Sequence, residues 1–239
     1  RLNGCGQPAS LALAAACLAL CGLAWQAGWL QRPLPMLWSV WGAAWVLGGA
    51  WLLRAGVAGW PRIPRAVRLV GGLLALWLAW LAVAQARVIG VNFLLSVLLL
   101  VWMADIAAYF AGRAFGLKFT RSRLAPSISP GKSWEGVWGG MVGVVVLAVA
   151  WVAADSHFQV ASASLYTRLA GAGWWLLLVA VVFLAALSVV GDLVESLVKR
   201  SAGAKDSSGL LPGHGGVLDR VDALLPTLPL AMMLATLIR

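Results

Sequence analysis

Long apolar stretches recur along the whole chain, and short polar segments that hold most of the charged residues separate them. A helix that crosses a membrane needs about 20 mostly apolar residues. Windows of this kind predict helices at residues 9–30, 35–53, 69–86, 88–111, 134–154, 174–198 and 217–238. Many of the 15 tryptophans fall near the ends of these windows, as interfacial aromatic residues do. We therefore expect an all-α, polytopic integral membrane protein with about seven transmembrane helices.

The composition narrows the class of protein further. Of the 239 residues, 62% are hydrophobic and only 11% are charged, and the mean hydropathy is +0.90. Average globular domains are about 45–50% apolar and about 25% charged. These values exclude an ordinary soluble domain, a disordered chain and a disulfide scaffold.

The distribution of basic residues predicts an orientation. Lys and Arg number 18 against 8 Asp and Glu, and in so apolar a chain this excess indicates loops that face an anionic membrane surface rather than a nucleic-acid partner. Loops 54–68, 112–133 and 199–216, together with Arg1, hold 13 basic residues, whereas the other side of the membrane holds 4. By the positive-inside rule these loops are cytoplasmic. We expect a protein integral to the cell (inner) membrane, with its active site on the cytoplasmic side.

The scarce acidic residues gather in the predicted spans, where an ionised carboxylate costs about 2.5–3.5 kcal/mol at the helix centre. The acids in the spans are Asp105, Asp192, Glu195, Asp219 and Asp222. With a rise of about 1.5 Å per residue, Asp105, Asp192 and Asp222 each lie about 8–9 Å from the cytoplasmic end of their span. A convergent carboxylate cluster with little histidine or thiol suits a hard cation such as Mg²⁺. The alternative is three unrelated buried acids, each satisfied by a local donor.

The loop before the last span adds groups that bind phosphate. Lys199, Arg200 and Lys205 are cationic donors, and the glycines Gly213, Gly215 and Gly216 around His214 allow close backbone approach to a ligand. Beside carboxylates, such donors indicate Mg²⁺–phosphate chemistry. The alternative is a basic loop with a glycine-rich turn.

A second polar segment, residues 127–136, offers Ser129 and Lys132 as phosphate contacts. Its Gly-Lys-Ser sequence is not a P-loop, because Pro126 stands where the first glycine is required and no strand precedes it. Glu135 begins a helix, where a carboxylate favours the helix dipole. The segment 155–173 on the other side of the membrane is rich in Ala, Ser and Gly, and we interpret it as a solvated connector.

These motifs resemble a known signature. Ser196-x-x-Lys199-Arg200, Lys205-Asp206, Pro212-Gly213-His214-Gly215-Gly216 and Asp219-Arg220-x-Asp222 together are similar to the signature of phosphatidate cytidylyltransferases (CDP-diacylglycerol synthases). Upstream, Asp105 with Tyr109 and Gly112-Arg113, Ser129-Pro130-Gly131-Lys132, Glu135-Gly136 and Gly191-Asp192 agree with it. The resemblance covers about residues 100–225. We therefore divide the chain into N-terminal transmembrane helices, 1–100, and a catalytic region, 101–239, with loops 112–133 and 199–216.

The resemblance implies a membrane enzyme that converts CTP and phosphatidate into CDP-diacylglycerol and pyrophosphate in phospholipid biosynthesis. It also implies a homodimer and dependence on Mg²⁺, with a contribution from a second cation such as K⁺. The family has further N-terminal membrane segments, and the chain begins with Arg1, so we expect that a segment precedes it.

The candidate residues follow from the motifs and the resemblance together. The metal ligands that the resemblance implies are Asp192, Asp219 and Asp222. The candidate catalytic residues are Lys199, Arg200, Lys205, Asp206, His214 and Arg220. The candidate substrate-binding residues are Ser129, Lys132, Ser196, Gly213, Gly215, Gly216, Asp105 and Arg113.

Two other classes compete with a nucleotidyltransferase. A cation transporter or channel also places carboxylates in membrane helices, but it predicts acids at several depths rather than at one interface. A purely structural membrane scaffold leaves the acid cluster without a purpose. A related enzyme class, the CDP-alcohol phosphotransferases, requires an Asp-rich spacing that this sequence lacks.

Overall fold

A computed structural model describes residues 4, 6–210 and 215–238 of the chain. The long helices are α1 (Gln7–Gln26), α2 (Pro35–Gly59), α3 (Arg65–Ile89), α4 (Val91–Phe115), α5 (Trp134–Phe158), α7 (Trp174–Ser201) and α9 (Leu224–Leu237). The short elements are η1 (Trp60–Arg62), β1 (Arg123–Ala125), β2 (Ser129–Ser133), α6 (Leu165–Ala172) and α8 (Leu218–Val221). Seven stretches, the last of them joining α8 to α9, are long and apolar enough to cross a membrane. The expectation of an all-α polytopic membrane protein is confirmed.

The helices begin and end where the local sequence favours a break. Pro35 occupies the first turn of α2, where its missing N–H costs nothing. Gly90 separates α3 from α4 with a φ of 155°, a conformation that residues with a Cβ rarely adopt. Ser133 caps α5, and its Oγ accepts a hydrogen bond from the backbone N–H of Gly136. Ser133 is also the last residue of β2, so the hairpin leads directly into the membrane helix α5.

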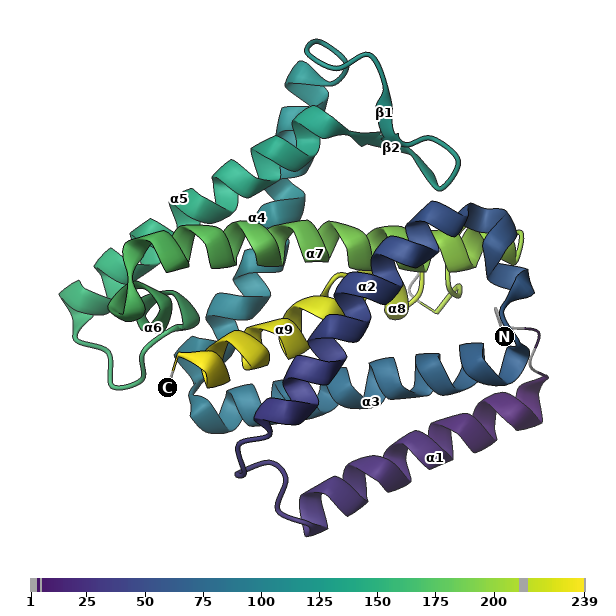
Figure 1. Cartoon of the computed structure of the whole chain (residues 1–239), viewed down its shortest axis with the longest axis horizontal. Helices are drawn as coiled ribbons and strands as arrows, with labels where there is room; N and C mark the ends of the chain where they lie inside the picture. Colours follow the sequence, from purple (N-terminus) through teal and green to yellow (C-terminus); the bar gives the residue numbers. More distant parts are fainter. Residues whose placement is uncertain (1–3, 5, 211–214, 239) are drawn as a thin grey trace.

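The helix α7 lies at the centre of the bundle and contacts α2, α4, α5, α6 and α9 (Figure 1). Its leucines Leu177, Leu184 and Leu197 are fully buried. One hydrophobic cluster joins buried residues from α1 through α9, so helices from both halves of the sequence share a core. Residues near the end of α7 are therefore held by packing along most of its length.

The helices α4 and α5 form the most extensive pair, because small residues let their backbones approach closely. A Cβ on Gly139 would lie 2.1 Å from the Cβ of Ala111, and one on Gly140 would lie 2.8 Å from the carbonyl oxygen of Ala104. Only glycine fits at these two positions. The close pairing of the two helices therefore fixes the position of Asp105, which lies on α4, relative to the hairpin that precedes α5.

The two ends of the bundle differ in what they carry (Figure 1). We call the end with η1, the hairpin β1–β2, the described residues of loop 202–217 (202–210 and 215–217) and α8 the basic end. The end with turn 27–34, Gly90 and α6 is the opposite end. The hairpin is antiparallel, with Arg123 opposite Ser133 and Ala125 opposite Ser129. This hairpin was not expected from the sequence.

The segment 155–173 is not the solvated connector that we expected. It contains the helix α6, of which Leu165, Tyr166 and Leu169 are fully buried. Asp155, at the end of α5, is also buried. The Ala, Ser and Gly composition misled the interpretation, because three large residues at helical spacing suffice to dock one short helix.

Candidate active site

Four elements bring polar side chains together at the basic end. The helix α7 carries a row of them in its last turns, α4 contributes Asp105, β2 contributes Lys132, and α8 with the residue after it contributes Asp219 and Asp222. Loop 202–217 lies beside this group through Ser207 and Gly216. The polar residues fall into two groups with different partners.

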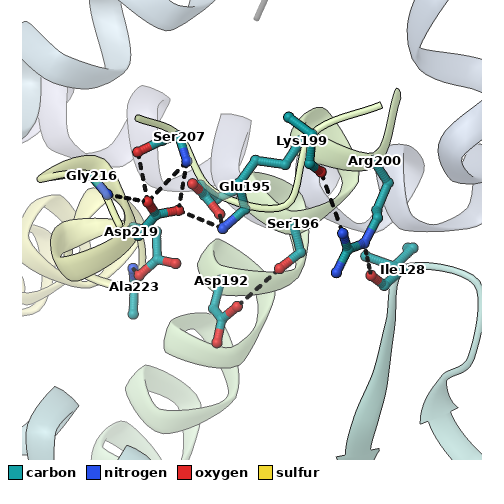
Figure 2. A network of polar contacts seen from close by, with 12 residues as sticks. Ile128, Asp192, Glu195, Ser196, Lys199, Arg200, Ser207, Gly216, Asp219 and Ala223 are labelled. Atoms are coloured by element: carbon teal, nitrogen blue, oxygen red, sulfur yellow. Dashed lines mark hydrogen bonds and ion pairs between the residues drawn. The ribbon is translucent and has the colours of Figure 1, made fainter. Parts of the chain in front are cut away.

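The first group surrounds Lys199. Its ammonium lies 2.6 Å from Oδ1 of Asp219 and forms a second ion pair with Glu195, one turn earlier on α7. The three side chains are only 4–11% exposed. Figure 2 shows Lys199 between these two acids. A charge buried to this degree is held in place by its partners, so the position of Lys199 is tightly defined.

Asp219 also orders loop 202–217. Its Oδ2 accepts hydrogen bonds from the backbone N–H of Gly216 at 2.7 Å and from the Oγ of Ser207 at 2.8 Å. The backbone N–H of Ser207 donates to the same oxygen at 2.9 Å. A Cβ on Gly216 would lie 2.1 Å from the Oγ of Ser207, so only glycine allows this approach. Gly215, with a φ of 77°, turns the chain into this position.

The second group consists of Asp105, Asp192 and Asp222. Asp192 forms an ion pair with Lys132 of the hairpin, and Oγ of Ser196 donates to its Oδ1 at 3.3 Å. Asp222 accepts the backbone N–H of Ala223 at 2.7 Å. The three carboxylates lie close enough to repel one another, and the ammonium of Lys132 attracts them. Negative charge is thus concentrated where three helices meet.

Gly191 explains why α7 comes so near to Asp222. A Cβ at this position would lie 2.8 Å from the carbonyl oxygen of Asp222 and 2.7 Å from the ring of Pro226. The glycine therefore permits the close crossing of α7 with the start of the last span. Asp192, the next residue, is placed beside Asp222 by the same crossing.

The oxygen-rich second group fits a hard divalent cation. Across residues 6–210 and 215–238, three His, Cys, Asp or Glu side chains do not converge into a closed metal site. Magnesium, however, binds through one or two carboxylates and completes its coordination with water and substrate phosphates. Asp192 and Asp222 offer such carboxylates, whereas Asp219 is occupied by Lys199 and loop 202–217. The role of the three aspartates as ligands of one metal stays a prediction.

The remaining candidates lie around these two groups. Arg200 is exposed and donates from Nε to the carbonyl of Ile128 at 3.4 Å, which links α7 to the hairpin. Arg113 donates to the Tyr109 hydroxyl at 3.3 Å on the exposed face of α4. Ser129 lies on β2 with Lys132. Lys205, Asp206 and Arg220 are exposed as well. Gly213 and His214 lie outside the described residues.

Two residues of the site were not among the candidates. Glu195 was counted as a membrane acid but received no role, although its i, i+4 spacing to Lys199 predicts an ion pair on one helix face. Ser207 had no signal in the sequence, because its contact with Asp219 depends on how loop 202–217 folds back.

Comparison with known proteins gives a consistent family. The profile of the cytidylyltransferase family matches residues 3–238. A phosphatidate cytidylyltransferase of Haemophilus influenzae is 49% identical over 140 residues, which cover 59% of this chain and 44% of the relative. One of Pseudomonas aeruginosa is 44% identical over 164 residues, 68% of this chain and 55% of the relative.

A more distant relative carries the same name. The phosphatidate cytidylyltransferase of Staphylococcus epidermidis is 38% identical over 151 residues, which cover 63% of this chain and 51% of the relative. In these three comparisons the matched part spans about half the length of the relatives.

Proposed function

This chain belongs to the cytidylyltransferase family, and from that premise we propose that it transfers the cytidylyl group of CTP to phosphatidate, giving CDP-diacylglycerol and pyrophosphate. The observation that carries the proposal is the second group of the site. Carboxylates from three membrane helices interact electrostatically there with one another and with Lys132, which pairs with Asp192. The names of the relatives supply the substrates.

The chemistry suits this arrangement. A phosphate oxygen of phosphatidate attacks the α-phosphorus of CTP, a new P–O bond forms, and the bond to the bridging oxygen of the β-phosphate breaks. That oxygen leaves with both electrons as part of pyrophosphate. The attacking oxygen is already anionic at neutral pH, so a strong general base is not required. The barrier lies in bringing two polyanions together and in stabilising charge around the α-phosphoryl group.

The residues of the site divide this work. Lys199, fixed between Glu195 and Asp219, presents a cation at a defined place for phosphate oxygens. Lys132 lies on a hairpin outside the bundle and can leave Asp192 to follow a phosphate. Mg²⁺, held by Asp192 and Asp222 with Asp219 nearby, would neutralise phosphate charge and polarise the α-phosphoryl group. Asp105 adds negative charge that favours a bound cation.

Several finer assignments belong to this proposal. We infer that Arg200, Lys205, Asp206, His214 and Arg220 contact CTP or pyrophosphate, and that K⁺ contributes to the metal site. Residues 101–239 carry the chemistry, and residues 1–100 serve as supporting membrane helices. The protein is a homodimer in the cell (inner) membrane with its basic end in the cytoplasm. The loop charges support that orientation.

A cation transporter is the competing function. A conduction path requires polar groups that continue across the membrane. Asp105, Asp192 and Asp222, the second group, all lie at the basic end. At the opposite end, the carboxylate of Asp155 is enclosed by neutral hydrogen-bond donors. The relatives are also named as transferases. Both observations favour the enzyme.

Purified protein in detergent or nanodiscs, supplied with CTP, phosphatidate and Mg²⁺, tests the proposal. We expect release of pyrophosphate and formation of CDP-diacylglycerol, both lost when ATP replaces CTP or when a chelator removes the metal. A folded preparation that forms no CDP-diacylglycerol under these conditions would disprove the proposed activity.

A further inference from the structure

A large apolar cavity lies between α1, α2, α3 and α7. Its volume is about 820 Å³, within the range of about 300–1,000 Å³ that is common for small-molecule sites. Apolar side chains form most of its wall, including Leu13 of α1, Leu52 of α2 and Leu76 of α3. Water is a poor occupant for such a wall inside a membrane, so a hydrocarbon is the expected content.

The cavity is continuous with the candidate active site. Glu195 and Ser207 line it, and these two residues also contact Lys199 and Asp219, respectively. Figure 2 shows Glu195 and Ser207 close to Asp219. From this end the wall continues along α3 from Val67 to Leu76, a rise of about 14 Å. The cavity therefore leads from the polar site toward the middle of the membrane.

One cationic side chain, Arg68, lines the cavity near the basic end. Arg68, in the first turn of α3, lines the cavity and lies over the ring of Trp60 at 5.9 Å. Its Nε is buried and, among the described residues, has no hydrogen-bond partner. A buried donor of this kind is costly unless a ligand supplies an acceptor. Ester and phosphate oxygens of a glycerophospholipid are acceptors, and its acyl chains match the rest of the wall.

We propose that this cavity binds one acyl chain of the phosphatidate substrate, with an oxygen of the lipid head region accepting from Arg68. The inference rests on the proposed function, because it takes the lipid from that reaction. It also assigns a role to helices α1–α3, which carry none of the candidate residues. The occupant is an anionic glycerophospholipid rather than a second copy of the chain, because the cavity is continuous with the polar site.

Two glycines allow the cavity to be filled without disturbing the packing. Gly48 of α2 and Gly72 of α3 line the cavity, and a Cβ at either would meet no atom within 4 Å. Gly22 of α1 is equally open but lies outside the cavity wall. Gly48→Leu and Gly72→Leu therefore fill the cavity, and Gly22→Leu is the matched control for the gain in helix propensity.

Turnover with two substrates tests the proposal. We expect each filling variant to lower kcat/KM for dioleoyl phosphatidate about tenfold or more while dihexanoyl phosphatidate is used as well as before. Gly22→Leu should change neither value. Equal losses for both chain lengths, or no loss for the long chain, would overturn the proposal. Absence of turnover with either lipid in the unaltered protein would instead count against the proposed function.

A binding experiment gives a readout that does not require turnover. Phosphatidate with a diazirine near the end of one acyl chain should label peptides of α1, α2 and α3, and Gly48→Leu should reduce that labelling at least fivefold relative to Gly22→Leu. Arg68→Gln should weaken the labelling, and Arg68→Lys should restore part of it. Labelling spread evenly over all lipid-facing helices, or cross-links between two copies of the chain at this wall, would contradict an acyl-chain site.

Discussion

Acidic residues gather at both ends of the bundle, and their surroundings are opposite. At the opposite end, Asp155 is 5% exposed and accepts from Asn92 Nδ2 at 2.9 Å, the backbone N–H of Ser164 at 3.1 Å and Thr167 Oγ1 at 2.5 Å. At the basic end, the charges of Asp105, Asp192 and Asp222 interact unfavourably with one another. The first carboxylate is satisfied by neutral donors, whereas the other three compete for a cation.

The difference separates a structural acid from acids kept for chemistry. A fully hydrogen-bonded polar network rigidifies the fold around it, and here it docks α6 onto α5 and α4. Carboxylates that repel one another destabilise the fold unless a ligand compensates them, so such conflicts gather at functional sites. We therefore expect substitutions at the basic end to affect turnover and those at the opposite end to affect stability.

The largest effect is expected for Asp222→Asn. The change keeps the shape of the side chain but removes a charge from the group that would hold the metal. Turnover should fall about 10³-fold or more, comparable to the loss of an electrostatic contact to a transition state. The thermal midpoint in detergent should stay within a few degrees, because the mutual repulsion of the three carboxylates is relieved. The measurements are steady-state pyrophosphate release and thermal unfolding.

Asp155→Asn is the matched control at the opposite end. Its folded fraction should retain turnover, since Asp155 lies at the opposite end of the bundle and has only neutral partners among the described residues. A normal rate for Asp222→Asn, or a 10³-fold loss for Asp155→Asn, would reverse the assignment of the two ends.

The same contrast shows what the sequence could predict. The spans were predictable because membrane helices must be about 20 apolar residues long. The common depth of three acids was inferred from helical rise alone and stays a prediction. Depth does not tell which way a side chain points. Asp219 and Asp222 are three residues apart, yet Asp219 pairs with Lys199 while Asp222 interacts electrostatically with Asp192.

Short irregular elements were harder to predict. The β2 sequence Ser-Pro-Gly-Lys-Ser lacks the alternation of a strand, so the hairpin that brings Lys132 to Asp192 had no signal. The helix α6 was hidden because its three buried side chains and its hydrogen bonds to Asp155, and not its composition, fix it against the bundle. In both cases tertiary contacts rather than local preference decide the structure.

Lys199→Met should affect both turnover and stability, because its two buried ion pairs also hold a cation in the candidate active site. The substitution keeps the apolar stem but leaves Glu195 and Asp219 without their shared cation, a loss of about 3–5 kcal/mol for a buried pair. Turnover should fall about 10²-fold as a phosphate contact is lost. Adding Glu195→Gln should restore part of the thermal midpoint but none of the rate. Recovery of both would make Lys199 a purely structural residue.

A smaller effect is expected for Asp155→Ala. Removing the carboxylate leaves the donors of Asn92, Ser164 and Thr167 buried without their acceptor, which costs about 2–3 kcal/mol. The thermal midpoint should fall, and limited proteolysis near 159–163 should become faster as α6 undocks. Asp155→Asn, which keeps an acceptor, should lose less. Equal losses for the two variants would mean that the charge, rather than the acceptor, holds α6.

The smallest effect, for Tyr166→Phe, tests the same docking of α6 through pH. The Tyr166 hydroxyl donates to the carbonyl of Ser96 at 2.8 Å, so its loss should cost about 1 kcal/mol near neutral pH.

Burial raises the pKa of Tyr166 well above its ordinary value, whereas in the unfolded chain the phenol ionises near pH 10. The unfolded state alone therefore releases this proton as pH rises above about 10, and the native tyrosine loses stability there while phenylalanine does not. The difference between the thermal midpoints should narrow above about pH 10 and vanish near pH 11. A difference that stays constant across this range would show that Tyr166 ionises equally in both states, and that α6 is not sealed from water as its burial indicates.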